Sequence, residues 1–374
     1  MDFIPVCEPF LNGNELKYVN DCINTGWISS SGKYVKAFEE KFADYCQAKY
    51  GVAVCNGTVA LHLALISAGI KPGDEVIIPD FTMIASAFAV CYIGAIPVFI
   101  DADPNTWNID VSNIEEKISA KTKAIMPVSI FGQPCDMDTI WHLAEKYNLM
   151  VIEDAAESHG AEYKGRKAGS LADISAFSFF ANKNITTGEG GMIVTNKKEL
   201  YDKARYHKNL CFPLDSPRDY RHNDIGFNYR MSNLHAAIGL AQTEKAEEYV
   251  EMRIKNAELY RKYLSEIPGI IFQMTPQNLK SVHWMNAIII DSSKYGRTRN
   301  ELIDFLKVNN IETRLLFIGM HKQSSLINYG CNPNGNYKVT EWLSDNGLYL
   351  PSASNLSKTS IEYVCDLISK FSKL

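Results

Sequence analysis

Short apolar runs alternate with longer amphipathic stretches through the first half of the chain. The runs are rich in Val, Ile and Phe and are bounded by Gly, Pro and Asp, a pattern typical of buried β-strands. The stretches between them, such as residues 58–70 and 137–148, have the apolar spacing of helices. The predicted strands are residues 52–55, 76–79, 96–101, 124–132, 149–156, 173–180 and 192–195.

This alternation predicts an α/β fold, in which helices cover both faces of a mostly parallel sheet. The pattern changes after residue 232. Residues 232–267 form one long helical stretch, which we expect to be interrupted only at Gly239.

A second, smaller domain is predicted beyond this stretch. Residues 283–291 and 312–317 have the character of strands, and residues 299–310 have that of a helix. We therefore predict a large domain over residues 1–245 and a smaller α+β domain over residues 246–374.

The composition is that of an ordinary globular protein, with 46% hydrophobic and 22% charged residues over 374 positions. A formal net charge of −5 argues against a nucleic-acid binder, which is usually basic. No apolar run approaches the roughly 18 residues of a membrane-spanning helix, and the first residues have no secretory-signal pattern. The nine cysteines are scattered, with no CxxC pair. We therefore expect a cytoplasmic protein with reduced thiols and no metal site.

One lysine, Lys183, lies between an apolar run and a glycine cluster in the segment FSFFANKNITTGEGG (177–191). A lysine at such a place is either an ordinary surface residue of a turn or a nucleophile close to the end of a buried strand. The polar groups that the fold brings close to Lys183 decide between these two interpretations.

Asp154, in the segment VIEDAAESHG, falls at the carboxyl end of a predicted strand. Ligands of open α/β sheets bind outside such ends. Taken alone, Asp154 is explained as the cap of the following turn. Its functional interpretation is a carboxylate that pairs with a protonated ring nitrogen, because a buried pyridinium needs a negative partner.

A phosphate site is predicted where the first strand leads into a helix, in CNGTVALHLAL. The free N–H groups of a helix start bind anions, and Gly57 lets the backbone approach closely. Helix capping alone also explains Thr58 and its neighbours. Ser178 offers a hydroxyl for the same phosphate, although a serine in a strand often bonds nearby backbone instead.

The segment GFNYRMSN (226–233) places Asn228 and Arg230 two residues apart in an aromatic loop. They are either polar tips that point into a site or residues that hold the loop by hydrogen bonds. Together, the phosphate cradle, the strand-end carboxylate and the lysine are the parts that pyridoxal 5′-phosphate requires.

The chain also resembles a known family, the DegT/DnrJ/EryC1/StrS sugar aminotransferases. The resemblance covers nearly the whole sequence and is strongest to the GDP-perosamine synthase group. It implies the fold of type I pyridoxal phosphate enzymes, with a mostly parallel seven-stranded sheet in the large domain. It is carried by NGTVALHLAL, GDEVIIPDFT, GAIPVFIDAD, TKAIMPV, VIEDAAE, FSFFANKNITTGEGGM, NYRMSN and AAIGLAQ, in this order.

The resemblance assigns roles around the cofactor ring. It makes Lys183 the catalytic lysine, which binds the aldehyde covalently and moves the proton. It pairs Asp154 with the ring nitrogen, and Glu157 stands where the family has Gln or Glu near the 3′-oxygen.

The resemblance also implies a homodimer with shared sites. Gly57, Thr58 and Ser178 then hold the phosphate, and Asn228 reaches that phosphate from the neighbouring subunit. Arg230, on the same loop, is a weaker candidate for contacting the carboxylate of the amino donor, L-glutamate.

Three segments depart from the family pattern. Met83 stands where the family commonly has an aromatic ring stacked on the cofactor; methionine is polarizable and can cover a ring face. The loops of residues 208–224 and 312–325 are divergent and basic. The basic side chains of these loops either bind a phosphate of the acceptor or form a solvated surface. These residues are Arg218, Arg221, His222, Arg314, His321 and Lys322.

The leading prediction is an aminotransferase that moves the amino group of L-glutamate to a keto sugar nucleotide, such as GDP-4-keto-6-deoxymannose, for surface polysaccharide synthesis. A small keto phosphate such as dihydroxyacetone phosphate is the alternative acceptor. A sugar dehydratase on the same fold carries histidine in place of the lysine, so Lys183 argues against it. A non-catalytic regulator would not need Asp154, Ser178, Lys183 and Asn228 together.

Overall fold

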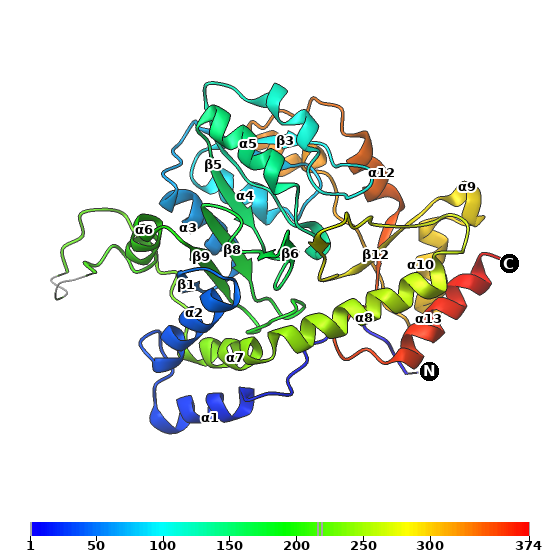
Figure 1. The fold of residues 1–374 in the computed structure, drawn as a ribbon, viewed down its shortest axis with the longest axis horizontal. Helices are drawn as coiled ribbons and strands as arrows, with labels where there is room; N and C mark the ends of the chain where they lie inside the picture. Colours follow the sequence, from blue (N-terminus) through cyan, green and yellow to red (C-terminus); the bar gives the residue numbers. More distant parts are fainter. Residues whose placement is uncertain (1, 215–216, 218–219, 374) are drawn as a thin grey trace.

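The computed structural model describes residues 2–214, 217 and 220–373 (Figure 1). Its helices are α1 (Glu15–Thr25), α2 (Lys33–Tyr45), α3 (Gly57–Ser67), α4 (Ala85–Tyr92), α5 (Met137–Tyr147), α6 (Lys198–Lys208), α7 (Asn233–Glu244), α8 (Ala246–Leu264), α9 (Ser292–Tyr295), α10 (Arg299–Val308), α11 (Ser324–Tyr329), α12 (Lys338–Asn346) and α13 (Lys358–Phe371).

Its strands are β1 (Tyr50–Val54), β2 (Glu75–Pro79), β3 (Ile96–Ile100), β4 (Thr122–Ile125), β5 (Met150–Asp154), β6 (Glu162–Tyr163), β7 (Arg166–Lys167), β8 (Ile174–Ser178), β9 (Gly191–Thr195), β10 (Ile270–Phe272), β11 (Leu279–Lys280), β12 (Asn286–Ile290), β13 (Arg314–Leu315) and β14 (Gly347–Leu350).

Seven strands within the described residues form the large sheet, in the order β1-β9-β8-β5-β4-β2-β3. All neighbours from β8 to β3 pair in parallel, whereas β9 runs antiparallel to both β1 and β8. The predicted α/β fold with a mostly parallel seven-stranded sheet is therefore confirmed.

Helices cover both faces of this sheet, because alternate residues of a strand point to opposite sides. On one face, Val52 and Ile193 pack with α3 and α4. On the other, Ala53 and Val194 pack with α2 and α7, and α5 covers the sheet beside β4 and β5. The helix α3 is apolar on all sides and is buried almost throughout, as expected of a helix that lies inside a core.

Two element boundaries differ from the prediction. The helix α7 continues through Gly239, whose missing side chain leaves room for Phe38; a Cβ there would lie 2.6 Å from that ring. The expected interruption at Gly239 is wrong, and the two helices meet instead at Lys245. The run 124–132 forms only the short strand β4, then turns through a 3-10 helix at Ile130–Gly132.

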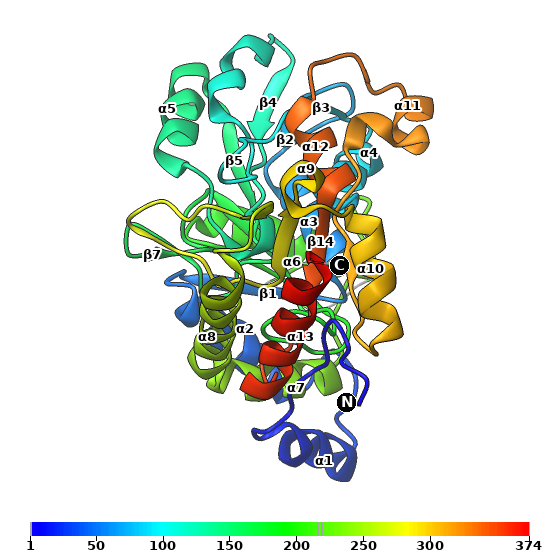
Figure 2. The same cartoon turned by 90° about the vertical axis from the view of Figure 1, so that its right-hand side faces the viewer.

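The C-terminal part of the described chain contains a four-stranded antiparallel sheet in the order β10-β12-β14-β13. The helices α10 and α13 pack on this sheet, and α8 packs against α13 (Figure 2). Ile4, from the other end of the chain, lies in the same core. The domain boundary at residues 245–246 stays a prediction.

Within the described residues, no helix combines the length and the apolar character that a membrane crossing requires.

Candidate active site

Lys183 lies in the turn that follows β8, where its N–H donates to the carbonyl of Phe180 at 2.9 Å. Its side-chain Nζ lies 3.6 Å from the centre of a Trp284 ring. Burial lowers the pKa of the Lys183 ammonium, against the opposing effect of the Glu157 and Asp154 carboxylates. The structure thus brings the predicted lysine and both predicted carboxylates to one place.

Asp154 ends β5 and is 4% exposed. Its Oδ2 accepts a 2.8 Å hydrogen bond from the Ser86 hydroxyl, and its Oδ1 accepts from the N–H of Ala156 at 3.1 Å. Burial raises the pKa of Asp154, whereas these two hydrogen bonds and the charge of Lys183 lower it. Asp154 therefore both caps the following turn and faces the lysine.

Glu157 is buried one turn further along the chain. Its Oε2 accepts a 2.7 Å hydrogen bond from the N–H of Phe131, a residue with φ of 55° in the turn after β4. Burial raises the pKa of Glu157 to about 7, although the positive charge of Lys183 lowers it. Two buried carboxylates thus accompany one half-buried lysine.

The start of α3 and the end of β8 form a close-fitting cradle. The Asn56 side chain caps α3 by accepting from the N–H of Val59 at 3.0 Å. A Cβ on Gly57 would lie 2.6 Å from the Cβ and 3.0 Å from the Oγ of Ser178, so only glycine lets the backbone come this close. The first N–H groups of a helix have no partner inside the helix and attract anions.

This arrangement fits pyridoxal phosphate. The cradle between Gly57 and Ser178 supplies amide and hydroxyl donors for a phosphate, with Thr58 next in the helix. Asp154 supplies a buried carboxylate at the end of β5, and Lys183 supplies an amine just after the end of the neighbouring parallel strand β8. Ser178 also accepts a long 3.4 Å hydrogen bond from the N–H of Phe180, so its backbone role and a phosphate role coexist.

Met83 lies between β2 and α4 and is 48% exposed. Its sulfur accepts a hydrogen bond from the N–H of Ala85 at 3.0 Å. A half-exposed thioether held in this way offers an apolar surface to a bound ring.

The loop with Asn228 and Arg230 runs beside the turn that precedes α3, because the N–H of Cys55 donates to the carbonyl of Tyr229 at 3.0 Å. Asn228 is exposed. Arg230 donates to Oδ1 of Asn209 at 2.9 Å, which is the loop-holding role that the sequence left open.

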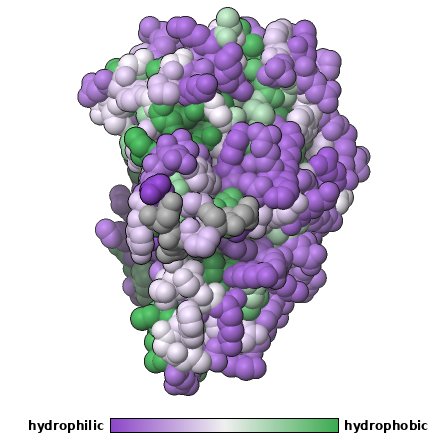
Figure 3. Space-filling view, turned by 90° about the vertical axis from the view of Figure 1, so that its left-hand side faces the viewer, coloured by the Kyte–Doolittle hydropathy of each residue, from purple (hydrophilic) through white to green (hydrophobic). Residues whose placement is uncertain are grey.

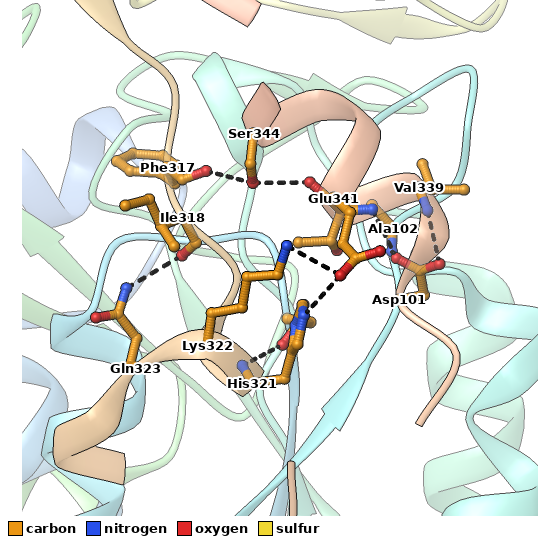
Figure 4. Close-up of polar contacts among 12 residues, drawn as sticks. Asp101, Ala102, Phe317, Ile318, His321, Lys322, Gln323, Val339, Glu341 and Ser344 are labelled. Carbon is orange, nitrogen blue, oxygen red and sulfur yellow. Dashed lines mark hydrogen bonds and ion pairs between the residues drawn. The ribbon is translucent and has the colours of Figure 1, made fainter. Parts of the chain in front are cut away.

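His321 lies between the large sheet and α12, and Figure 4 shows its ring joined to Glu341 of that helix. Its Nδ1 lies 2.6 Å from Oδ2 of Asp80, which follows β2, and its ring stacks on Tyr337 at 4.5 Å. Burial lowers the pKa of His321, but the contacts with Asp80 and Glu341 raise it above its ordinary value. The neighbouring Lys322 pairs with Glu341 at 2.9 Å. These contacts join the 320–322 turn to the large sheet and to α12.

The remaining basic candidates do not gather at one point. Arg314 is exposed and pairs with Glu312 at 3.1 Å. Arg221 and His222 lie on the loop after α6, which projects from the body in Figure 1, away from the C-terminal sheet that carries Arg314. Arg218 lies outside the described residues.

Comparison with known proteins decides the family. The model of the "DegT/DnrJ/EryC1/StrS aminotransferase family" matches residues 9–369. The chain belongs to this family. It is therefore a pyridoxal phosphate-dependent aminotransferase, as the sequence predicted.

Curated relatives and solved structures agree with this assignment. The aminotransferase is 44% identical over 372 residues to the GDP-perosamine synthase of Escherichia coli O157:H7, covering 99% of both chains. It is 40% identical over 370 residues to that of Vibrio cholerae, covering 98% of this chain and 99% of the relative. Among solved structures, DesI in the presence of its TDP-sugar product has a TM-score of 0.91 at 30% identity, covering 100% of this chain and 93% of the other.

Sequence reasoning missed three residues around Lys183 of the aminotransferase. Trp284 was placed inside a strand of residues 283–291, but β12 begins only at Asn286, and the indole lies against the lysine. Ser86 and Phe131 could not be identified from the sequence. Ser86 acts through a hydroxyl in an otherwise apolar helix, and Phe131 acts through its backbone N–H.

We expect Gly57→Ala to weaken cofactor binding about 10- to 150-fold. The new Cβ would lie 2.6 Å from the Cβ of Ser178, so α3 and β8 must separate where the phosphate binds. Loss of one charge-assisted hydrogen bond costs about 1.5–3 kcal/mol, at 1.4 kcal/mol per tenfold. Equilibrium dialysis of pyridoxal phosphate measures the change. Gly13→Ala is the matched control, because its nearest contacts would be only side-chain atoms at 3.3 Å or more, from the carboxylate of Glu15 and Cδ of Lys245. Equal affinity of both variants would contradict the assignment of the cradle.

Proposed function

We propose that this aminotransferase moves the amino group of L-glutamate to a nucleotide-linked 4-keto-6-deoxy sugar, with GDP-4-keto-6-deoxymannose as acceptor, for surface polysaccharide synthesis. The observation that carries the proposal is the buried group of Lys183, Asp154 and Glu157 in a chain whose relatives are named GDP-perosamine synthase. That name describes an enzyme whose product is a GDP-linked amino sugar.

The side chains divide the chemistry as follows. When bound, pyridoxal phosphate supplies a ring that takes up the electrons left when a proton leaves the amino-bearing carbon. Asp154 keeps a proton on the ring nitrogen, which its buried position at the end of β5 suits. Lys183 takes the proton from the donor carbon at Nζ and later returns it, which its lowered pKa favours.

The other residues position the cofactor. The backbone of Gly57 and Thr58 and the hydroxyl of Ser178 would bind its phosphate. Glu157, held by the N–H of Phe131, would interact with the 3′-oxygen, and Met83 would supply an apolar surface for the ring.

Arg230 remains a weaker candidate for the carboxylate of glutamate. Arg221, Arg314 and His321 remain candidates for the acceptor, but His321 already has Asp80 as a partner and Arg314 has Glu312. Of these residues we expect the arginines to contribute more to recognition of a phosphate, because a guanidinium donates two parallel hydrogen bonds.

We also propose a homodimer with two shared sites. Large apolar side chains of the N-terminal region are exposed, among them Leu16, Ile23 and Trp27 of α1 and the turn after it. Exposed apolar residues that gather in this way favour an interface. Figure 3 views the face from which the loop after α6 projects, where hydrophobic side chains lie among the hydrophilic ones. Asn228, exposed at the base of this loop, is placed to reach a second subunit.

Mixing two inactive variants tests the shared site. Lys183→Ala and Asn228→Ala each remove one residue of a site, so a refolded mixture should regain up to about a quarter of wild-type activity from hybrid sites with both native residues. This estimate follows from random pairing of two equal pools in a twofold dimer. The rate of glutamate-dependent amino transfer is the readout. If mixing restores nothing, each chain completes its own site.

All nine cysteines, each within the described residues, are free thiols. This supports a cytoplasmic location, where thiols stay reduced.

The acceptor is tested directly. The enzyme is incubated with glutamate and either GDP-4-keto-6-deoxymannose or dihydroxyacetone phosphate, and 2-oxoglutarate is measured. We expect turnover with the nucleotide sugar only. Amination of the three-carbon keto phosphate alone would overturn the proposed acceptor and leave the aminotransferase chemistry intact. Loss of a hydroxyl as water, without 2-oxoglutarate, would favour the dehydratase.

A further inference from the structure

Trp284 presents an aromatic face to the amine of Lys183. Its ring centre lies 3.6 Å from Nζ, and Trp284 itself is 5% exposed. An ammonium over an indole is attracted by the negative face of the ring, and tryptophan gives the strongest such contact.

Three hydrogen bonds hold Trp284 in this place. Its N–H donates to the carbonyl of Phe131 at 2.9 Å, and its own carbonyl accepts from the guanidinium of Arg253 at 2.8 Å. Its indole Nε1 donates to the carbonyl of Asn182 at 2.9 Å. Because Asn182 directly precedes Lys183, the indole is tied to the same turn whose lysine it faces.

The same network fixes Glu157. Phe131 donates its N–H to Glu157 and accepts the N–H of Trp284 through its carbonyl. The backbone of one residue therefore holds both the Glu157 carboxylate and the Trp284 indole, the two groups that act on the lysine amine.

Charged and titratable groups from several segments surround this amine. The carboxylates of Glu157 and Asp154 and the thiol of Cys7 favour the ammonium, and the guanidinium of Arg253 opposes it. His159 is buried close enough to sense the charge of Lys183. Cys7 lies 3.4 Å from Arg253 and 3.5 Å from the carbonyl of Asn182. The indole is the aromatic surface in direct contact with the amine.

We propose that Trp284 is a positioning residue for Lys183: its indole face holds the side-chain amine beside Asp154 and Glu157 whenever that amine carries no covalent bond. The inference rests on the proposed role of Lys183. A free lysine side chain samples many rotamers. A lysine that moves a proton must stay in one of them, and a fixed aromatic surface provides this without a permanent bond.

The test uses the full-length protein freed of cofactor. Pyridoxal phosphate is added at a series of pH values, and the rise of visible absorbance gives the rate at which Lys183 reacts. Only the unprotonated amine attacks an aldehyde, so the rate should rise with pH to a plateau. The pH at the midpoint of this rise reports the proton affinity of the Lys183 amine. The plateau rate reports how well the amine is positioned for attack. The variants are Trp284→Leu, which removes the aromatic face, and Trp284→Phe, which keeps a weaker one.

The leucine variant should shift the midpoint to lower pH by about 0.4–1.5 units, because the ammonium loses a contact of about 0.5–2 kcal/mol at 1.36 kcal/mol per unit. Its plateau rate should fall about 10-fold or more, as expected when a reacting group is misplaced. The midpoint pH and the plateau rate of the phenylalanine variant should lie between those of the leucine variant and the wild type. Trp141→Leu is the matched control and should change neither value, because that indole also donates to a backbone carbonyl, at 2.7 Å to Leu171, but lies on α5.

A folded leucine variant with the wild-type midpoint and plateau overturns the proposal. So does a phenylalanine variant no better than leucine, since the ring face would then not be what holds the amine. If the leucine variant fails to fold, a phenylalanine variant with an unchanged profile overturns it. A wild-type protein that shows no absorbance rise, or a Lys183→Ala variant that still shows one, rejects the proposed role of Lys183 itself and this inference with it.

Discussion

Lys183→Ala is expected to abolish amino transfer and to remove the covalent link between protein and cofactor. Lys183 Nζ lies 3.6 Å from the centre of a Trp284 ring, and its charge interacts with the carboxylates of Asp154 and Glu157, a set of neighbours that no other lysine has within the described residues. Loss of a positioned proton carrier costs about 10²- to 10⁴-fold in rate, and loss of the nucleophile adds to this. Turnover with glutamate and mass analysis after borohydride reduction measure the two effects.

Lys167→Ala is the matched control for this prediction. Lys167 is also half-buried and lies over an aromatic ring, 3.9 Å from the centre of Tyr45, but it pairs with Glu247 far from the carboxylates of the site. We expect this variant to keep its activity and its covalent label. A Lys183→Ala protein that transfers amino groups at the wild-type rate would remove the basis of the proposed mechanism.

Asp154→Asn is expected to lower kcat by about 10²- to 10⁴-fold while the protein remains folded. Asparagine keeps the shape, because its Oδ1 can accept from the N–H of Ala156 and its NH2 can donate to the Ser86 hydroxyl, but it removes the negative charge. Breaking a buried charge pair by neutralising one partner costs about 3–5 kcal/mol, and in the proposed mechanism that partner is the protonated ring nitrogen. The cofactor-free protein should lose no stability, because burial already disfavours the ionised carboxylate.

The neighbouring carboxylate provides the control. Glu153 is also buried but points to the opposite face of β5, where Gly169 and Ser175 donate to it at 2.9 and 2.8 Å. Glu153→Gln should therefore leave kcat close to wild type. Steady-state rates of the two variants separate a specific effect of Asp154 from a general effect of neutralising a buried acid. Equal losses in both would contradict the assignment.

The parts of the fold that depend on local patterns could be predicted from the sequence. The apolar runs predicted all seven strands of the large sheet, and their alternation with helices predicted that most of these strands are parallel. The antiparallel direction of β9 was not predicted, because it depends on the tight turn around Lys183 rather than on the strand itself. Gly239 was misjudged because its role is to make room for Phe38, a contact between α7 and α2.

The residues of the site also differ in whether the sequence alone could predict them. Lys183, Asp154 and Gly57 stand at strand or helix ends and carry their chemistry in their residue type. His321 was visible only as a basic residue, since its partner Asp80 is 241 positions away. Trp284 resembled one more apolar residue of a strand, and only the folded chain brings its ring to the lysine.

The first residues of the chain lie in the core of its last part. The N–H of Ile4 donates to the carbonyl of Asn310 at 2.8 Å, and the N–H of Ser352 donates to the carbonyl of Val6 at 2.7 Å. During synthesis, this segment leaves the ribosome before its partners, which emerge about three hundred residues later. At about 5–20 residues per second the segment waits at least some 15 seconds without them. The large sheet is complete by Thr195 and can assemble in that interval, so the aminotransferase closes its second core only after Ser352 has emerged.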